Sequence, residues 1–263
     1  MDYRELTPAP RLRPYVRCYW TLHAPAVAGA APQRVLPDGC VEMIINVGAI
    51  GLVGVRFAPG GALPFLSVSP SELRDAAPAL EDVTPPFEPY LAERLADATD
   101  GTEALVLDAA LTRQMEKTRR PLDRRIRASV RAAFSGDPPL RVDALSALTG
   151  FGARQLERCF RDQVGYGPKT LCRLARFQRV VRAMEPTGEV SWARLAAEND
   201  YADQSHMARE FREFSGTTLT AYRRELHPMS DRFHAAPIDP EPDGAEEGSA
   251  LSDFSKTGPR SAR

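Results

Sequence analysis

The sequence predicts an α+β protein in which a short β-rich front precedes a long helical region. Apolar runs of strand length, bounded by turn residues, occur before about residue 75. From Phe87 the apolar residues recur at helical spacing, and the last stretch is rich in Pro, Gly, Ser and acidic residues. We therefore predict four segments: a β-rich domain at 1–86, a helical linker at 87–135, an all-α domain at 136–228 and a disordered tail at 229–263.

The composition favours a globular protein, because 43% of the residues are hydrophobic and 26% are charged. No apolar run reaches the roughly 18 residues that a transmembrane helix needs, so we expect no membrane partner. The N-terminus lacks the basic start and apolar core of a signal peptide. The four cysteines show no C-x-x-C pairing, which argues against a zinc ribbon and suits a cytoplasmic location.

Charge is distributed unevenly along the chain. Residues 1–112 carry 8 Lys/Arg and 14 Asp/Glu, residues 113–227 carry 22 and 14, and residues 228–263 carry 4 and 7. A basic block between two acidic ones favours a polyanionic partner for that block. An Arg-rich, solvated helical surface explains the same charge equally well.

The front contains two clear strand patterns. "VEMIINV" follows the turn "PDGC", Pro37 to Cys40, and "LVGVRFAP" ends at Pro59-Gly60-Gly61. We expect about four strands in all. A barrel with a ligand-sized interior needs about eight strands, so four strands are too few to close one.

The middle of the chain changes to helical spacing. Five leucines recur with this period, broken around "ATDGTE": Leu91, Leu95, Leu105, Leu107 and Leu111. Pro121 is well placed to start another helix, Leu122 to Phe134. The Arg-rich run at 119–127 is predicted to be solvated.

A repeat follows within the helical part. "VDALSALTGFGARQLERCFRDQVGYGPKTLCR" begins at Val142, and "WARLAAENDYADQSHMAREFREFSGTTLTAYR" begins at Trp192. Three landmarks of the first copy, Leu156, Phe160 and Gly165, recur 51 residues later as Met207, Phe211 and Gly216. A longer helix, about Pro168 to Met184, separates the copies. A short helix, a tight turn and a second amphipathic helix in each copy predict two helix-turn-helix units.

The outward faces of the two second helices are polar. In a helix-turn-helix unit the second helix enters the major groove, so we expect double-stranded DNA as the partner. Arginine can pair with guanine and glutamate can accept from cytosine. The outward residues are Arg154, Glu157, Arg158 and Arg161 in the first copy, and Ser205, His206 and Arg209 in the second.

These residues also have other interpretations, chiefly a hydrolase triad and a metal site. Asp203, Ser205 and His206 could suggest a hydrolase, but neighbours on one helix point apart and no G-x-S-x-G motif occurs. His206 lacks a second histidine at helical spacing, which argues against a metal site. We expect no metal, no cofactor and no catalytic residue. Arg158 could instead pair with Asp162, and Arg154 could bind phosphate without reading sequence.

The two copies resemble the C-terminal DNA-binding domain of AraC/XylS-type transcriptional regulators over about residues 125–227. The resemblance implies seven helices and one linking helix that holds both recognition helices on one side. They would enter successive major grooves about 34 Å apart. It adds Gln204 to the reading face and assigns Asp203 as a helix N-cap. Three positions depart from the family pattern: Gly152, Asp200 and Leu219.

The front has a relative as well. "VLPDGCVEMIINV" and "GVRFAPGGALPFL…SELRD" resemble an N-terminal domain of poorly known function that is fused to such DNA-binding domains. Only "GAIG" joins the two motifs, so either the domain is shortened or its sheet is remodelled. The resemblance implies a sensor or dimerisation role for residues 1–86. Asp38 and Glu42 could line a small-molecule site, although a β-turn role for Asp38 is the stronger interpretation.

The resemblance therefore implies a sequence-specific transcriptional regulator that reads two successive major grooves and is not an enzyme. A small-molecule effector, RNA polymerase and a second copy of the chain are the further partners it implies. The alternative is a ligand-binding or interaction protein whose DNA-binding domain has lost specific DNA binding. The acidic front and the changed residues at 152, 200 and 219 motivate that alternative.

Overall fold

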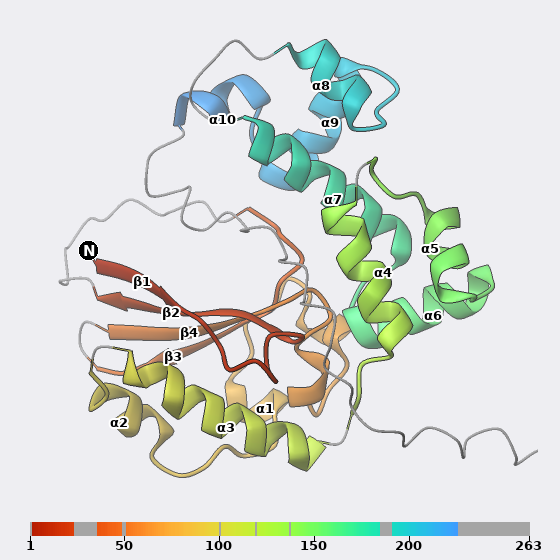
Figure 1. Ribbon diagram of the computed structural model, residues 1–263. Helices are drawn as coiled ribbons and strands as arrows, with labels where there is room; N and C mark the ends of the chain where they lie inside the picture. Colours follow the sequence, from red (N-terminus) through yellow and green to blue (C-terminus); the bar gives the residue numbers. More distant parts are fainter. Residues whose placement is uncertain are drawn as a thin grey trace, which may run out of the picture.

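The computed structural model describes residues 2–23, 36–48, 51–99, 101–118, 120–136, 138–184 and 191–225. It confirms the α+β class, with an antiparallel sheet first and a helical region after it (Figure 1). The predicted tail at 229–263 lies outside the described residues. No helix in the described part of the chain is long and apolar enough to cross a membrane.

The front forms an open four-stranded sheet, as predicted. Its strands are β1 (Asp2–Leu6), β2 (Val16–His23), β3 (Glu42–Asn46) and β4 (Gly51–Phe57). All neighbours are antiparallel, in the order β1-β2-β4-β3. Val55 of β4 pairs with Tyr19 on one side and Met43 on the other, and all three are buried. The two central strands therefore supply most of the sheet's share of the core, with Met43 added from the edge strand β3.

Helices α1 (Leu80–Val83), α2 (Leu91–Ala96) and α3 (Thr102–Thr118) lie against one face of this sheet (Figure 1). Two short 3-10 helices, η1 (Leu63–Phe65) and η2 (Pro70–Leu73), precede them, and η2 packs on the helical region. Leu107 and Leu111 of α3 pack in one cluster with Tyr19 and Val55 of the sheet. The Tyr19 hydroxyl donates to Asp108 of α3 at 2.7 Å. Leu105, which shares the leucine spacing, is 68% exposed and lies outside this core.

The segment predicted as a linker is divided between two cores. Helices α2 and α3 pack on the sheet, whereas Ile126 and Val130 of α4 (Arg124–Ser135) belong to the helical core. Helix α4 starts two residues after the predicted Leu122, because Asp123 caps it by accepting the Arg125 N–H at 2.8 Å. Arg120, predicted to be solvated, donates to the carbonyls of Leu66 and Val68. Amphipathic spacing predicted these helices but not the surfaces they cover.

The helical region contains the predicted repeat. Helices α5 (Val142–Thr149) and α6 (Ala153–Val164) form the first unit, and α8 (Trp192–Glu198) and α9 (Gln204–Ser215) form the second. Helix α7 (Pro168–Ala183) connects them, and α10 (Leu219–Glu225) follows. With α4, the described residues between 124 and 225 form the seven helices that the resemblance implies. Gly165 and Gly216 end α6 and α9 in the left-handed conformation.

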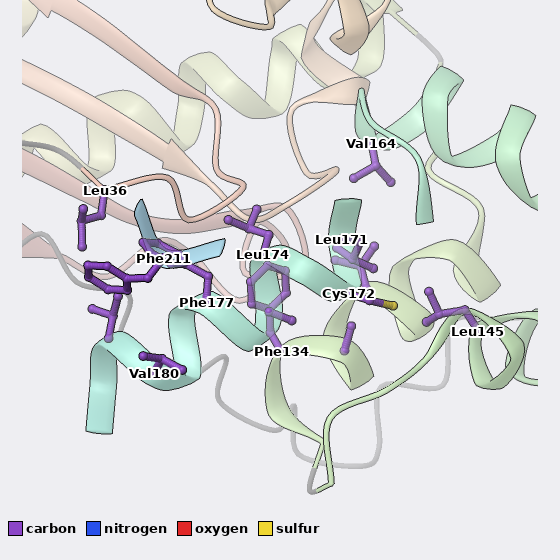
Figure 2. Close-up of a cluster of buried hydrophobic side chains, with 14 of the residues drawn as sticks. Leu36, Phe134, Leu145, Val164, Leu171, Cys172, Leu174, Phe177, Val180 and Phe211 are labelled. Carbon is purple, nitrogen blue, oxygen red and sulfur yellow. The ribbon is translucent and has the colours of Figure 1, made fainter. Parts of the chain in front are cut away.

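Both units pack on α7 (Figure 2). Leu171 and Cys172 of α7 face the first unit's side of the core, near Leu145. The Phe177 ring lies 5.3 Å from the Phe211 ring of α9, centroid to centroid. One helix thus carries apolar contacts to both units, which is how a tandem repeat of small helical units gains a common core.

The front domain docks on the first unit and on α7. Gln178 of α7 donates to the Pro37 carbonyl at 2.7 Å, and Arg74 donates to the Gly165 carbonyl at the end of α6 at 2.9 Å. Gly39, in the turn "PDGC", has φ +79°, and a Cβ there would lie 2.5 Å from the Tyr166 hydroxyl oxygen. Only glycine fits such a close approach in this backbone conformation. The turn that the sequence predicted is therefore a contact between the two parts.

Candidate nucleic-acid interface

The first recognition helix, α6, buries one face and exposes the other. Leu156, Phe160 and Val164 are buried, in positions three or four residues apart. Arg154, Arg158 and Arg161 are exposed, and Glu157 is half-buried. The predicted outward residues of this helix are therefore accessible as a group, with Glu157 the least so.

Glu157 has a partner within its own helix. Its Oε1 accepts from Arg161 at 2.9 Å, an i,i+4 ion pair, and it lies against Gly167 at the start of α7. The ion pair that forms within α6 is thus Glu157–Arg161. The pair that the sequence suggested, Arg158–Asp162, is one residue further along the helix. In this geometry Arg154 and Arg158 are the side chains of α6 that project freely from the helix toward a ligand.

The second recognition helix, α9, follows the same plan. Met207 and Phe211 are buried, whereas Gln204, Ser205 and Arg209 are exposed. Asp203 accepts the His206 N–H at 2.7 Å, so its predicted role as N-cap is confirmed. At the matching place in the first unit, Gly152 precedes α6 without a side-chain cap. The two helices therefore start differently although their inner faces match.

His206 is half-buried and turns back toward the start of its helix. Its Nδ1 accepts the Ala202 N–H at 3.4 Å, and its ring meets the Tyr201 ring edge-on at 5.4 Å. Asp203 is occupied as a cap and Ser205 is exposed, so these three side chains do not converge as a catalytic triad requires. His206 reaches the outer surface less fully than Gln204 and Arg209.

The turns of the two units share a left-handed residue. Gly150 has φ +68° in the first, and Asp200 has φ +57° in the second. A left-handed backbone costs most residues about 1 kcal/mol, and Asp tolerates it better than most. Arg176 donates to the Asp200 carbonyl at 3.2 Å, and Arg141 pairs with its carboxylate at 3.5 Å. The left-handed backbone at Asp200 is thus held in place by contacts with two arginines.

A cleft of about 1130 Å³ separates the first unit from α9. The start of α5, one face of α7 and the N-terminal half of α9 line it. Its cationic side chains are Arg141, Lys169, Arg173, Arg176 and Arg209. Three of these come from α7 at spacings of four and three residues, which places them on one helix face. Arg141 and Lys169 were not singled out from the sequence, although the α7 spacing was visible there.

Burial affects two ionisable groups of this cleft. It raises the pKa of the Cys172 thiol to about 11, so this cysteine stays protonated at neutral pH. Burial and the neighbouring Glu210 carboxylate raise the pKa of the Tyr201 hydroxyl, which therefore remains a hydrogen-bond donor. All four cysteines are free thiols.

Comparisons with known proteins agree with this geometry. Residues 145–225 match the family described as "Helix-turn-helix domain", and residues 4–52 match the "Domain of unknown function (DUF6597)". No curated protein matches the chain significantly.

Several solved structures are similar at low identity. A probable AraC family transcriptional regulator from Rhodopseudomonas palustris is 21% identical, with 40% of this chain and 96% of that chain covered and a TM-score of 0.34. An apo ToxT variant from Vibrio cholerae is 12% identical, with 86% and 97% covered and a TM-score of 0.38. ToxT bound to an unsaturated fatty acid is 14% identical, with 67% and 69% covered and a TM-score of 0.36.

The fold and the helical domain define a tandem helix-turn-helix protein of the DNA-binding class. Residues 145–225 belong to a helix-turn-helix domain family, and residues 4–52 belong to a domain family of unknown function. The two resemblances noted in the sequence are confirmed, for the helical domain and for the front.

Proposed function

We propose that the two units read two successive major grooves of one DNA duplex, in a sequence-specific manner. The observation that carries this proposal is the pairing of α6 and α9. The two helices have the same length, start 51 residues apart and pack on one helix, α7. Each keeps a polar outer face over a buried apolar one. A shared frame with different outward residues suits two helices that read different bases.

The exposed side chains divide into two roles. Arg158 and Arg209 lie near the middle of their helices and are the candidates for hydrogen bonds to base edges, together with Arg154, Gln204 and Ser205. Glu157 and Arg161 neutralise each other, so we assign Arg161 to phosphate contact rather than base reading. Arg141 and Lys169, at the edge of the cleft, are further phosphate candidates.

An effector that binds the front domain would act through contacts that already exist. The "PDGC" turn contacts Gln178 of α7 and Tyr166 of the loop before α7, and Arg74 contacts the end of α6. A ligand that moved either element would move the first unit and the linking helix with it. The support for this route is the position of these contacts, which join the front domain to the first unit and to α7.

Selection from a random duplex pool tests the proposal. The full chain is incubated at low salt with a duplex pool of about 30 bp, and the bound DNA is sequenced over several rounds. We expect a bipartite motif, and an affinity for it that falls steeply with salt, because phosphate contacts release counterions. If every sequence is bound equally weakly, the chain is an interaction protein that has lost specific DNA binding.

A further inference from the structure

A carboxylate is buried on the inner face of the second recognition helix. Glu210 is 4% exposed and lies between Met207 and Phe211 along that face. The matching position of the first unit, 51 residues earlier, is Cys159, which packs against the apolar core. Burying a charged group is costly unless it is paired and hydrogen-bonded. The second unit therefore has a buried carboxylate at a position where the first unit has a cysteine.

Three side chains satisfy this carboxylate. Arg173 donates to Glu210 Oε2 at 2.7 Å, and Arg176 donates to both oxygens at 3.2 Å. The Tyr201 hydroxyl donates to Oε1 at 2.9 Å. The arginines belong to α7, whereas Tyr201 belongs to the turn of the second unit. The carboxylate thus joins the linking helix to the turn and to the recognition helix at one point.

Aromatic rings and a second carboxylate fix the arginines in turn. The Arg173 guanidinium lies 5.0 Å from the Phe214 ring centroid and also pairs with Glu213 at 2.5 Å. Arg176 lies 4.7 Å from the Tyr201 ring centroid. Both guanidinium groups are therefore held by cation–π contacts as well as by charge.

We infer that Arg173, Arg176, Tyr201 and Glu210 form a clamp that fixes the orientation of α9 on α7 and thereby the spacing of the two half-sites. This inference rests on the proposed function. Apolar packing is not directional, whereas a guanidinium–carboxylate contact has a defined geometry. The hydrophobic contact of Phe177 with Phe211 holds the two helices together, and the clamp sets the angle between them.

The clamp also assigns a role to two cations of the cleft. Arg173 and Arg176 line it, yet each is committed to a carboxylate of α9. They are positioning residues, and the phosphate contacts are left to the other cations. Glu210 is the key member because removing its charge leaves two partly buried guanidinium groups without their shared partner.

The first test compares the half-site spacing that three full-length proteins select from the random duplex pool. Glu210→Gln keeps the size of the side chain and removes its charge. Glu213→Gln removes a carboxylate from the same helix, but an exposed one that only Arg173 contacts, and serves as the matched control. Tyr201→Phe is the milder variant, which removes one hydrogen bond and keeps the ring, in case Glu210→Gln does not fold.

We expect the wild type and Glu213→Gln to select one spacing. Glu210→Gln should lose about tenfold in affinity at that spacing, equivalent to about 1.4 kcal/mol, and accept neighbouring spacings nearly as well. Its affinity for the isolated first half-site should not change, which a general loss of structure would not produce. A Glu210→Gln variant with the wild-type spacing preference would overturn the inference.

A second readout needs no DNA. Spin labels on unnatural amino acids at the exposed positions Gln155 of α6 and Arg212 of α9 report the distance between the two helices. Glu210→Gln should broaden this distance distribution about twofold, because the directional contacts are lost. If the wild type selects no motif, the proposed function fails, whereas an unchanged distance distribution in Glu210→Gln rejects the clamp itself.

Discussion

The two helix-turn-helix units have the same hydrophobic frame but are held in different ways. In the first, the inner face of α6 is apolar, and its C-terminal end contacts the front domain through Arg74 and Gly165. In the second, α9 carries Glu210 on its inner face and is joined to α7 by ion pairs. The first unit thus shares contacts with the front domain, whereas the second is joined to α7 by ion pairs and to the first unit by the Arg141–Asp200 pair.

This difference indicates which part of the molecule can move. The first unit, α7 and the front domain are connected by apolar contacts and by hydrogen bonds to the backbone at Pro37 and Gly165. The orientation of the second unit relies on directional polar contacts with α7. We therefore expect the first unit to provide stability and the second to determine how the tandem fits its DNA.

Truncating the shared frame should produce the largest effect. Phe160→Ala and Phe211→Ala each remove a fully buried ring, and each should lower the free energy of unfolding by about 3–5 kcal/mol. Amide hydrogen exchange, measured for each helix, should become faster mainly in α8 to α10 in Phe211→Ala. In Phe160→Ala it should become faster in α4 to α7 in addition to α8 to α10. Leu148→Ala, at a 55% exposed position, serves as the control and should change stability by less than about 0.5 kcal/mol. Equal exchange in both units for both variants would contradict the difference.

Substitutions at the two corresponding inner positions, Glu210 and Cys159, should lower the free energy of unfolding by different amounts. Glu210→Ala leaves Arg173 and Arg176 without their shared carboxylate and should cost about 3 kcal/mol. Cys159→Ala, at the corresponding place, removes one partly buried sulfur and should cost about 1 kcal/mol. Denaturant unfolding of both variants measures the two values. Similar costs at the two positions would mean that the ion pairs add little beyond packing.

Removing one arginine from each reading face should weaken specific binding. Arg158→Ala and Arg209→Ala should each cost about 1–3 kcal/mol at the selected site and relax sequence preference in one half-site only. Arg194→Ala on α8 also removes an exposed arginine, one that pairs with Glu198, and should leave binding unchanged. Titration of fluorescent duplexes with substitutions in each half-site measures these effects. The assignment of the two faces fails if either arginine variant binds all sequences as well as the wild type.

The helix caps should give the smallest effects. Asp203→Ala removes the side chain that accepts the His206 N–H and should cost about 1 kcal/mol. Gly152→Ser should raise the free energy of unfolding by a few tenths of a kcal/mol. Serine fits this position because the φ of Gly152 is −67° and a Cβ there would meet nothing within 4 Å. Thermal unfolding can measure both changes. A stabilising Asp203→Ala would show that the cap is not formed in solution.

The sequence predicted the repeat, the caps and the open sheet because each depends on local spacing. It did not predict where the helices between Leu91 and Ser135 would pack, since an amphipathic face does not identify the surface that it covers. It also left the role of Glu210 open. The signals were present: an acid on an apolar face, in register with Cys159, and Arg173 and Arg176 on one face of the linking helix α7. Only the folded chain brings these residues together.

A hydroxyl-radical footprint of the full chain on its selected duplex tests the central claim most directly. Two recognition helices on one side of α7 should protect two stretches of backbone on one face of the DNA, one helical turn, about 10–10.5 bp, apart. Arg209→Ala should weaken one protected stretch and Arg158→Ala the other. A single protected stretch, or two that respond equally to both variants, would contradict reading by two separate units.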